Sequence, residues 1–463
     1  MATVLVSGAG VAGPVVAYWL RRCGFRPTIV ERRPALGLGD GGHAVDLFGA
    51  AVEVIERMGL LDAVHAARTR TVALSLIRPG PRPVDVDMSA LVTGVSSRHV
   101  EILRGDLVNV LHGATRDDVE YMFGDAVTGL TDSEGGVEVT FAHGPPRMFD
   151  LVVGADGLHS GIRRLVFGNV PEHFLGGYLG VFTVPYEIRP RGRMLGYSAV
   201  DRTVGVYEVG GDGRARALFM FRSADELDYD HRDSARQRQL LRTAFAGLGW
   251  DVPRLLEALD TADDFYFDAI SQIRMPSWSR GRVTLVGDAG YCPGPAVGGG
   301  TSLAVVGAHV LAAELAASRG DHAAGFLTYE RAMAETVRQS RRDRPLGTAH
   351  PRAENASPGV GDPARAPAAQ LAAPAAAARA HLLRGWARQD ARQRRPDRHA
   401  ADPVGALSAR PFSGHAPRPP PPRRSRPSAP PAGWAAAGSA PPARPAAGRQ
   451  RAWPPSCPLH CPS

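Results

Sequence analysis

Three glycines near the start of the chain have the spacing of a pyrophosphate-binding turn. They are Gly8, Gly10 and Gly13, in the pattern G-x-G-x-x-G, with Val11 and Ala12 between the last two. Glycine at these positions permits a tight turn, lets the backbone approach phosphates and lets a helix pack closely on a strand. The free N–H groups at the start of the helix favour an anion. The spacing therefore predicts a dinucleotide phosphate site.

An acidic residue follows where such a site needs one. Glu31 lies 18 residues after Gly13, at the end of a second apolar run. A carboxylate there accepts hydrogen bonds from a ribose diol and repels a 2′-phosphate. Glu31 therefore favours FAD or NAD over NADP, and the adjacent Arg32 is also predicted to bind the cofactor. The competing interpretation is a glycine-rich turn in an ordinary α/β protein, which does not require this order of strand, turn, helix, strand and acid.

Two later turns place an aspartate directly after an apolar strand. Asp156 follows the run 151–153, and Asp288 follows the run 283–286. The carboxyl ends of parallel strands face the ligand crevice of a doubly wound sheet, so both carboxylates are candidates for binding cofactor hydroxyls. The competing interpretation is a turn or helix-capping role, because Asp-Gly is a common turn sequence. Strand context favours the binding role.

A glycine cluster precedes the next predicted helix, which spans 301–315. Gly298, Gly299 and Gly300 come just before or at its start, and Thr301 follows them. Exposed N–H groups and the helix dipole can stabilise negative charge, such as that at the N1/O2 edge of a flavin. These four residues are therefore predicted to bind the cofactor.

The three motifs, in this order, resemble those of the class A flavoprotein monooxygenases, the para-hydroxybenzoate-hydroxylase-like family. The resemblance covers about residues 3–340 and is greatest to the bacterial branch that acts on polyketides and tetracyclines. It implies FAD as cofactor, NAD(P)H as co-substrate, and oxygenation of an aromatic or polycyclic molecule through a flavin C4a-hydroperoxide. Cofactor chemistry of this kind needs orientation and a dry pocket from the protein.

The resemblance also assigns roles to individual residues. It places the FAD diphosphate on Gly8, Gly10 and Gly13, and the adenosine ribose on Glu31. Arg104 matches the family arginine beside the diphosphate and ribityl chain, although a solvated arginine at a helix start is the alternative. The remaining assignments are Asp156 in the motif shared by FAD and NAD(P)H, Asp288 on the ribityl hydroxyls, and residues 298–301 under the isoalloxazine.

Two segments depart from the family pattern. The usual Gly-Asp-Ala-Ala-His reads Gly-Asp-Ala-Gly-Tyr at 287–291, and Gly-Gln-Gly-x-Asn reads Gly-Gly-Gly-Thr-Ser at 298–302. The glycines remain, and we expect the altered side chains to change the pocket. The alternating segment 174–222 is expected to form the substrate wall, with four aromatic candidates that also suit a core: Phe182, Tyr197, Tyr207 and Phe219.

The predicted fold class is α/β, a Rossmann-like FAD-binding domain with an inserted β-sheet substrate domain. The FAD-binding domain comprises 1–170 and 276–340, the substrate domain comprises 171–275, and a disordered low-complexity tail spans 341–463. Strands at 120–123, 136–141 and 149–153 are expected to form a meander. A return to a buried strand at 282–286 indicates the insertion.

The tail differs from the body in charge and composition. All 54 basic residues are arginine, and residues 1–340 carry a net charge of −6 whereas 341–463 carry +14, with 24 of the 39 prolines. The basic charge therefore implies no nucleic-acid affinity of the body. Three interpretations are a partner-binding tail, a solvated extension and a shifted reading frame in a GC-rich gene. The abrupt boundary favours the shifted frame.

Other features limit the function class. Four cysteines, with no signal peptide and no apolar run of 18 residues, predict a cytoplasmic protein outside the membrane. No metal site and no catalytic acid or base is assigned, and Cys292 is expected to be inert. A flavin-dependent halogenase needs a lysine, which this chain lacks. The alternatives are an FAD-dependent dehydrogenase or reductase of a hydrophobic substrate, or a non-catalytic protein that binds partners through its tail.

Overall fold

The computed structural model describes most of the first 342 residues. The described ranges are 1–36, 43–69, 73–77, 83–87, 98–185, 192–209, 214–294 and 299–342. Gly298 and residues 343–463 of the predicted tail lie outside the described residues. All described residues belong to the unit Met1–Arg410.

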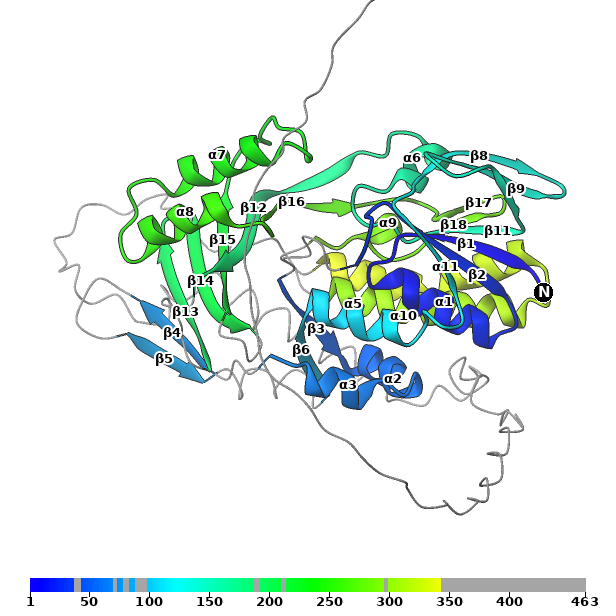
Figure 1. The fold of residues 1–463 in the computed structure, drawn as a ribbon, viewed down its shortest axis with the longest axis horizontal. Helices are drawn as coiled ribbons and strands as arrows, with labels where there is room; N and C mark the ends of the chain where they lie inside the picture. Colours follow the sequence, from blue (N-terminus) through cyan, green and yellow to red (C-terminus); the bar gives the residue numbers. More distant parts are fainter. Residues whose placement is uncertain are drawn as a thin grey trace, which may run out of the picture. The chain divides into compact units, whose positions relative to one another are not determined.

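A six-stranded sheet carries the dinucleotide motif (Figure 1). In order across the sheet, its strands are β17 (Ser279–Arg280), β18 (Val283–Leu285), β11 (Leu151–Gly154), β1 (Thr3–Ser7), β2 (Arg26–Glu31) and β7 (Glu120–Phe123). All pairings are parallel except that of β17 with β18. Val4, Leu5 and Val6 are fully buried, which explains why β1 reads as an uninterrupted apolar run.

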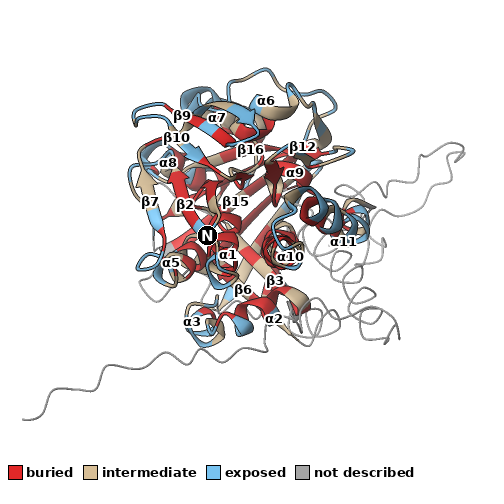
Figure 2. Cartoon of the chain, turned by 90° about the vertical axis from the view of Figure 1, so that its right-hand side faces the viewer, coloured by how far each residue is buried: buried red, intermediate tan, exposed pale blue. Residues whose placement is uncertain are grey.

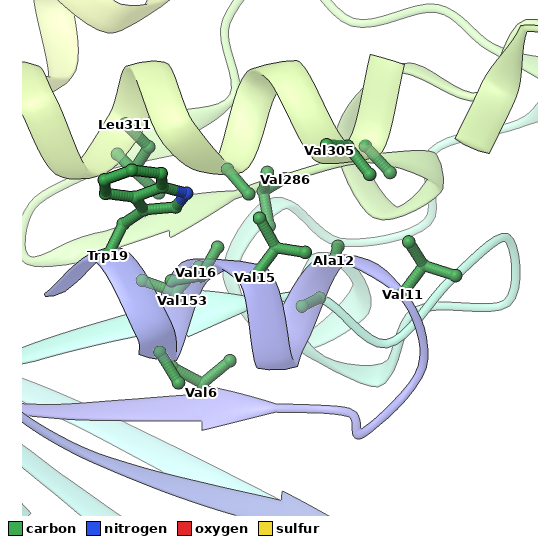
Figure 3. Close-up of a cluster of buried hydrophobic side chains, with 14 of the residues drawn as sticks. Val6, Val11, Ala12, Val15, Val16, Trp19, Val153, Val286, Val305 and Leu311 are labelled. Carbon is green, nitrogen blue, oxygen red and sulfur yellow. The ribbon is translucent and has the colours of Figure 1, made fainter. Parts of the chain in front are cut away.

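Helices cover one face of this sheet. They include α1 (Ala12–Arg22), α5 (Arg104–Gly113), α10 (Gly300–Ala317) and α11 (His322–Arg342). Figure 3 shows Val15 of α1 packed between the sheet and α10, with Trp19 beside Leu311. In Figure 2 α1 and α10 are mostly buried, because each lies between other elements.

Helix α10 has the length and composition of a membrane span, although no apolar run of 18 residues was expected. More than half of it is buried within the fold, where Val305 and Leu311 belong to the main core. Its apolar character is therefore explained by its central position between α1 and α11.

A three-stranded antiparallel sheet packs on the opposite face of the six-stranded sheet (Figure 1). Its strands are β8 (Val127–Ser133), β9 (Gly136–Phe141) and β10 (Arg147–Phe149). The predicted meander is therefore wrong in its pairing, because β7 and β11 join the parallel sheet instead. Strand β8 was not predicted, and a register shift between Val127 and Gly129 interrupts its alternation.

The inserted domain is a seven-stranded sheet. In order, its strands are β16 (Tyr266–Ile273), β12 (Glu172–Val184), β15 (Arg214–Arg222), β14 (Arg202–Val209), β13 (Arg193–Ala199), β4 (Ala73–Ile77) and β5 (Val84–Asp87). Five of these strands lie in the chain between β11 and β18, which are neighbours in the other sheet, so the predicted insertion and α/β class are confirmed. The sheet also takes β4 and β5 from the predicted 1–170 segment.

Two helices, α7 (Ser234–Phe245) and α8 (Val252–Thr261), cover one face of the seven-stranded sheet (Figure 1). The remaining elements lie between the two large sheets or beside the helical face, except α6, which packs beside β8. They are β3 (Ala44–Phe48), β6 (His99–Leu103), α2 (Gly49–Arg57), α3 (Leu61–Ala66), α6 (Gly161–Phe167) and α9 (Asp288–Tyr291). Strands β3 and β6 pair antiparallel, which brings the start of α5 beside residue 43.

Candidate functional site

The turn between β1 and α1 has no space for side chains at two of its glycines. Gly8 has a φ of +106°, and a Cβ built on it would lie 2.6 Å from the carbonyl oxygen of Ala155. A Cβ built on Gly13 would lie only 1.9 Å from the carbonyl oxygen of Gly8. Since real Cβ contacts are never this short, the backbone can follow this path only with glycine.

The third glycine faces an arginine. A Cβ on Gly10 would lie 3.2 Å from Nη2 of Arg104, so the guanidinium stands directly against the turn. Arg104 is the first residue of α5, and its backbone N–H donates to the carbonyl oxygen of His43 at 3.2 Å. The structure thus brings a cation to the N-terminus of α1, where both the helix and the guanidinium favour an anion.

The Glu31 carboxylate is fixed in place at the end of β2. Its Oε2 accepts from the backbone N–H of Ala9 at 2.8 Å, and its Oε1 accepts from that of Arg33 at 2.9 Å. Each oxygen has a second lone pair, so a diol can still bind. Arg32 and Arg33 are both exposed, and desolvation and then the like charge of Arg104 lower the Arg33 pKa.

The first and third sequence motifs meet in space. Val11 caps α1 and Ala12 is its first residue, and both are buried. A Cβ on Gly287, before α9, would lie 3.5 Å from the Cβ of Ala12. The turn that follows β18 is therefore in contact with the turn that follows β1, as expected for adjacent crevice loops.

Asp288 lies at the start of α9 and faces the next glycine cluster. A Cβ on Gly300 would lie 3.6 Å from its Oδ1, and the left-handed Gly299, with φ +74°, caps α10. Thr301 is half-buried in the first turn of α10. Burial raises the pKa of Asp288, while the charge of Arg104 lowers it. Gly298 is the one predicted site residue outside the described part of the chain.

Asp156 uses both carboxylate oxygens within its own loop. Its Oδ1 accepts from the hydroxyl of Ser160 at 2.5 Å, and its Oδ2 accepts from the backbone N–H of Ile162 at 3.0 Å. Burial raises its pKa. The turn role that competed with cofactor binding in the sequence analysis is therefore present: Asp156 holds the loop that leads into α6.

Two residues expected to alter the pocket instead belong to the core. Tyr291 is fully buried, its hydroxyl accepts from that of Tyr329 at 3.0 Å, and it packs against Trp278. A Cβ on Gly307 would lie 2.1 Å from the Tyr291 hydroxyl oxygen, so this glycine provides room for the tyrosine. Ser302 is also fully buried and donates to the carbonyl oxygen of Asp46 at 3.0 Å. The family departures at these positions are packing changes.

The predicted substrate wall divides between the two faces of the seven-stranded sheet. Phe182 and Phe219 are fully buried beneath α7, and Tyr197 stacks on Trp250 on the same side. Because side chains alternate along a strand, Tyr207 points to the other face. Its hydroxyl accepts from the N–H of Ala44 at 3.1 Å, which ties this face to β3.

The face of the seven-stranded sheet that α7 and α8 do not cover is called the open face below. It contains a different set of residues from the one predicted. An apolar cluster there comprises Leu179, Val181 and Ile270, with Leu218, Met220 and Tyr266 packed against it. The Tyr266 ring lies 6.1 Å from the His43 ring, centroid to centroid, and the Arg104 charge acts on its hydroxyl. Strand β16 was not predicted. The sequence nevertheless places an aspartate, Asp268, within this mostly apolar run, which is a signal of a functional carboxylate.

Two further observations concern the chemistry of the site. Cys292 is buried and its pKa is raised well above the usual value, first by burial and then by the charge of Asp288, so it is an inert thiol. Among the described residues, no group of three or more His, Cys, Asp and Glu side chains could hold a metal ion.

Residues 1–342 match the family described as FAD binding domain. An uncharacterized protein of Mycobacterium tuberculosis is 45% identical over 333 residues, which cover 71% of this chain and 89% of that protein. A flavin-dependent monooxygenase of Legionella longbeachae is 39% identical over 328 residues, covering 70% and 83%. The crystal structure of tetracycline destructase Tet(51) is 35% identical and covers 74% of this chain and 89% of that one, with a TM-score of 0.68.

Proposed function

This chain belongs to the FAD-binding-domain family of flavin-dependent monooxygenases, and we propose that it uses NAD(P)H and O₂ to oxygenate a polycyclic aromatic molecule. The observation that carries this proposal is the meeting of three strand-end turns at one place. Gly10 faces Arg104, Ala12 faces Gly287, and Asp288 faces Gly300. These contacts join segments almost 300 residues apart into one cradle that is lined by backbone and by the side chains of Arg104 and Asp288.

The residues present fit FAD. The adenosine ribose would bind Glu31, whose carboxylate is already oriented by two backbone N–H groups. The diphosphate would bind the first turn of α1 and the Arg104 guanidinium, which balances its charge. The ribityl chain and the isoalloxazine would bind Asp288 and the start of α10. When bound, FAD supplies the redox chemistry between NAD(P)H and O₂.

The protein's own contribution is positioning and exclusion of water. The open face of the seven-stranded sheet presents Leu218, Met220 and Tyr266 on the side that is joined to β3 by Tyr207. A flat aromatic substrate would be held between this apolar face and the cofactor. The tetracycline destructases named among the solved structures suggest a polycyclic phenol as the substrate class.

We place the activity in residues 1–342 and the protein in the cytoplasm, with a small molecule as its substrate. The family match and α11 both end at residue 342, close to the change in composition. We propose that the tail is not needed for FAD binding. A chain truncated after Arg342 should retain the flavin of the full chain, and loss of the flavin would favour a tail with a role in the fold.

The test is a flavin spectrum of the purified full-length chain, followed by NADH and NADPH oxidation with a panel of polycyclic phenols that includes tetracycline. We expect bound FAD, and a product that carries one oxygen atom from isotopically labelled O₂. Electron transfer from a substrate without labelled product would favour the dehydrogenase alternative. A colourless protein that cannot be reconstituted with FAD would contradict the assignment.

A further inference from the structure

A buried carboxylate in β16 connects two polar side chains. Asp268 is only 6% exposed, and its Oδ1 accepts from the backbone N–H of Ala269 at 2.9 Å. Its Oδ2 accepts from the Tyr266 hydroxyl at 3.2 Å and lies 3.1 Å from Nε2 of His159. One oxygen atom therefore joins a phenol and an imidazole into a continuous hydrogen-bonded chain.

The inner end of this chain lies at the proposed flavin site. Tyr266 is on the open face of the sheet, its ring is next to that of His43, and its hydroxyl is influenced by the charge of Arg104. The negative charge of Asp268 also acts on Asp288, where it raises the pKa. Burial raises the pKa of the Tyr266 hydroxyl, so this hydroxyl keeps its proton at neutral pH.

The outer end reaches solvent. His159 lies between α6 and β11, its side chain is 32% exposed, and its Nδ1 is 3.1 Å from Oε1 of Glu172. The ring of His231 stacks on it at 4.5 Å between centroids, and Nη2 of Arg163 lies 3.9 Å from Glu172. These residues, with Asp268, are the charged or titratable groups that face His159 in the described structure.

The protonation state of His159 decides whether this ring can donate a proton to Asp268. Burial lowers its pKa, but hydrogen bonds to Asp268 and Glu172 outweigh burial and raise the pKa to about 9. Burial and the His159 charge lower the pKa of His231, so the two stacked rings do not both carry charge at neutral pH. An imidazolium with carboxylates at both nitrogens can only donate, so His159 can supply a proton to Asp268 through Nε2.

We propose that His159, Asp268 and Tyr266 form a chain that carries a proton from solvent to the oxygen-reacting site. This inference rests on the proposed function, because oxygenation with NAD(P)H takes up one proton as NAD(P)H, O₂ and substrate become NAD(P)⁺, hydroxylated product and water. The Tyr266 hydroxyl, which donates to Asp268 in the structure, first turns its O–H toward an oxygen anion in the site. Its O–H bond then breaks as the anion gains the proton, and the Tyr266 oxygen is left ready to accept one from Asp268. A proton then passes from Nε2 of His159 through Oδ2 of Asp268 to the Tyr266 oxygen, and His159 regains a proton from solvent.

The test uses the full-length, FAD-loaded protein with its flavin photoreduced and then mixed with O₂. Reoxidation of the reduced anion by O₂ to FAD and hydrogen peroxide takes up one proton and needs neither substrate nor NAD(P)H. Tyr266→Phe and His159→Gln should slow reoxidation about 100-fold at pH 8, the lower end of what general acid catalysis contributes. Added imidazole or a lower pH should restore the rate, since both supply protons that do not pass through His159, Asp268 and Tyr266.

Tyr229→Phe is the matched control. Tyr229 also lies near Asp268 and loses a hydroxyl in the variant, but its ring packs on Tyr178 and Phe267 beneath the helices. We expect wild-type reoxidation in this variant. Asp268→Asn is less informative because it leaves the charged His159 ring without this buried carboxylate and can unfold the protein.

Two results would overturn the proposal. One is wild-type reoxidation in Tyr266→Phe, and the other is a slow variant whose rate responds to neither imidazole nor pH, as a structural role would give. The proposed function has a separate readout, which is labelled oxygen in the product. A protein that binds FAD and relays protons but labels no panel substrate would contradict the proposed function and leave the proton relay supported.

Discussion

The two sides of the proposed site are built in different ways. On the side of the parallel sheet, backbone contacts at Gly8 and Gly13 leave no room for a single added carbon atom. On the side of the seven-stranded sheet, the surface is made of side chains such as Leu218 and Met220, which are packed but not enclosed by backbone. A backbone cradle suits a constant cofactor, whereas a side-chain face can change with the substrate. The following experiments test this difference.

The largest effect is expected at Gly13. Gly13→Val places carbon atoms where the carbonyl oxygen of Gly8 lies 1.9 Å away, and neither segment can move without breaking β1 or α1. We expect a loss of more than about 4 kcal/mol in the free energy of unfolding, so that no flavin-loaded protein is recovered. Urea unfolding and the FAD content of the purified protein measure the result.

Gly24 is the control for Gly13. It has φ +87°, but a Cβ there meets nothing within 4 Å. Gly24→Ala should cost about 1 kcal/mol through backbone strain alone and leave FAD bound. Equal losses in the Gly13 and Gly24 variants would show that the backbone cradle is no more demanding than an ordinary turn.

A pair of neighbouring residues separates the two faces of the seven-stranded sheet. Phe219→Ala removes a fully buried ring that contacts Phe182 and Phe245, and should cost about 3–5 kcal/mol of stability. Leu218→Ala, on the open face and half-buried, should cost about 1 kcal/mol and change KM for the substrate. Thermal unfolding and KM distinguish the two; a KM change in the Phe219 variant alone would reverse our assignment of the faces.

Glu31→Gln tests the one side chain that completes the backbone cradle. The amide keeps its shape but loses the charge that accepts from Ala9, Arg33 and the ribose. Hydrogen bonds to a charged group contribute about 1.5–3 kcal/mol, so Kd for FAD should rise about 10- to 100-fold, as measured by flavin fluorescence. Glu138→Gln, at an exposed position on β9, should leave Kd unchanged.

A pH dependence of stability is expected at His159. Its folded-state pKa is raised from 6.5 to about 9, so its contribution to stability is complete below pH 6.5 and is lost as the pH rises through 9. Wild-type Tm should therefore fall between pH 7 and pH 10 by more than that of His159→Gln. Parallel decreases in the two proteins would show that the carboxylates of Asp268 and Glu172 do not stabilise the charged ring.

The ease of predicting each part follows from how local its interactions are. Strand β1, helix α1 and Glu31 lie within 31 consecutive residues, so spacing alone identified them. Asp156 was less clear, because a carboxylate after a strand is equally suited to a ligand or to its own loop, and only Ser160 and Ile162 show that it holds the loop. Tyr291 was read as a pocket residue because nothing in the sequence shows the space provided by Gly307.

The sequence by itself determined the fold class and a dinucleotide site, since glycine spacing and apolar runs are local consequences of backbone geometry. The order of its three motifs indicated FAD by family resemblance. The tertiary structure decided which face of the inserted sheet meets the site. Alternation gives two faces but does not say which one α7 and α8 cover, so the sequence left Phe182 and Phe219 as candidates for either the substrate wall or the core, and the structure places them in the core. The tertiary structure also decided that Tyr266, Asp268 and His159 are joined by hydrogen bonds, because His159 and Asp268 are 109 residues apart and meet only in the folded chain.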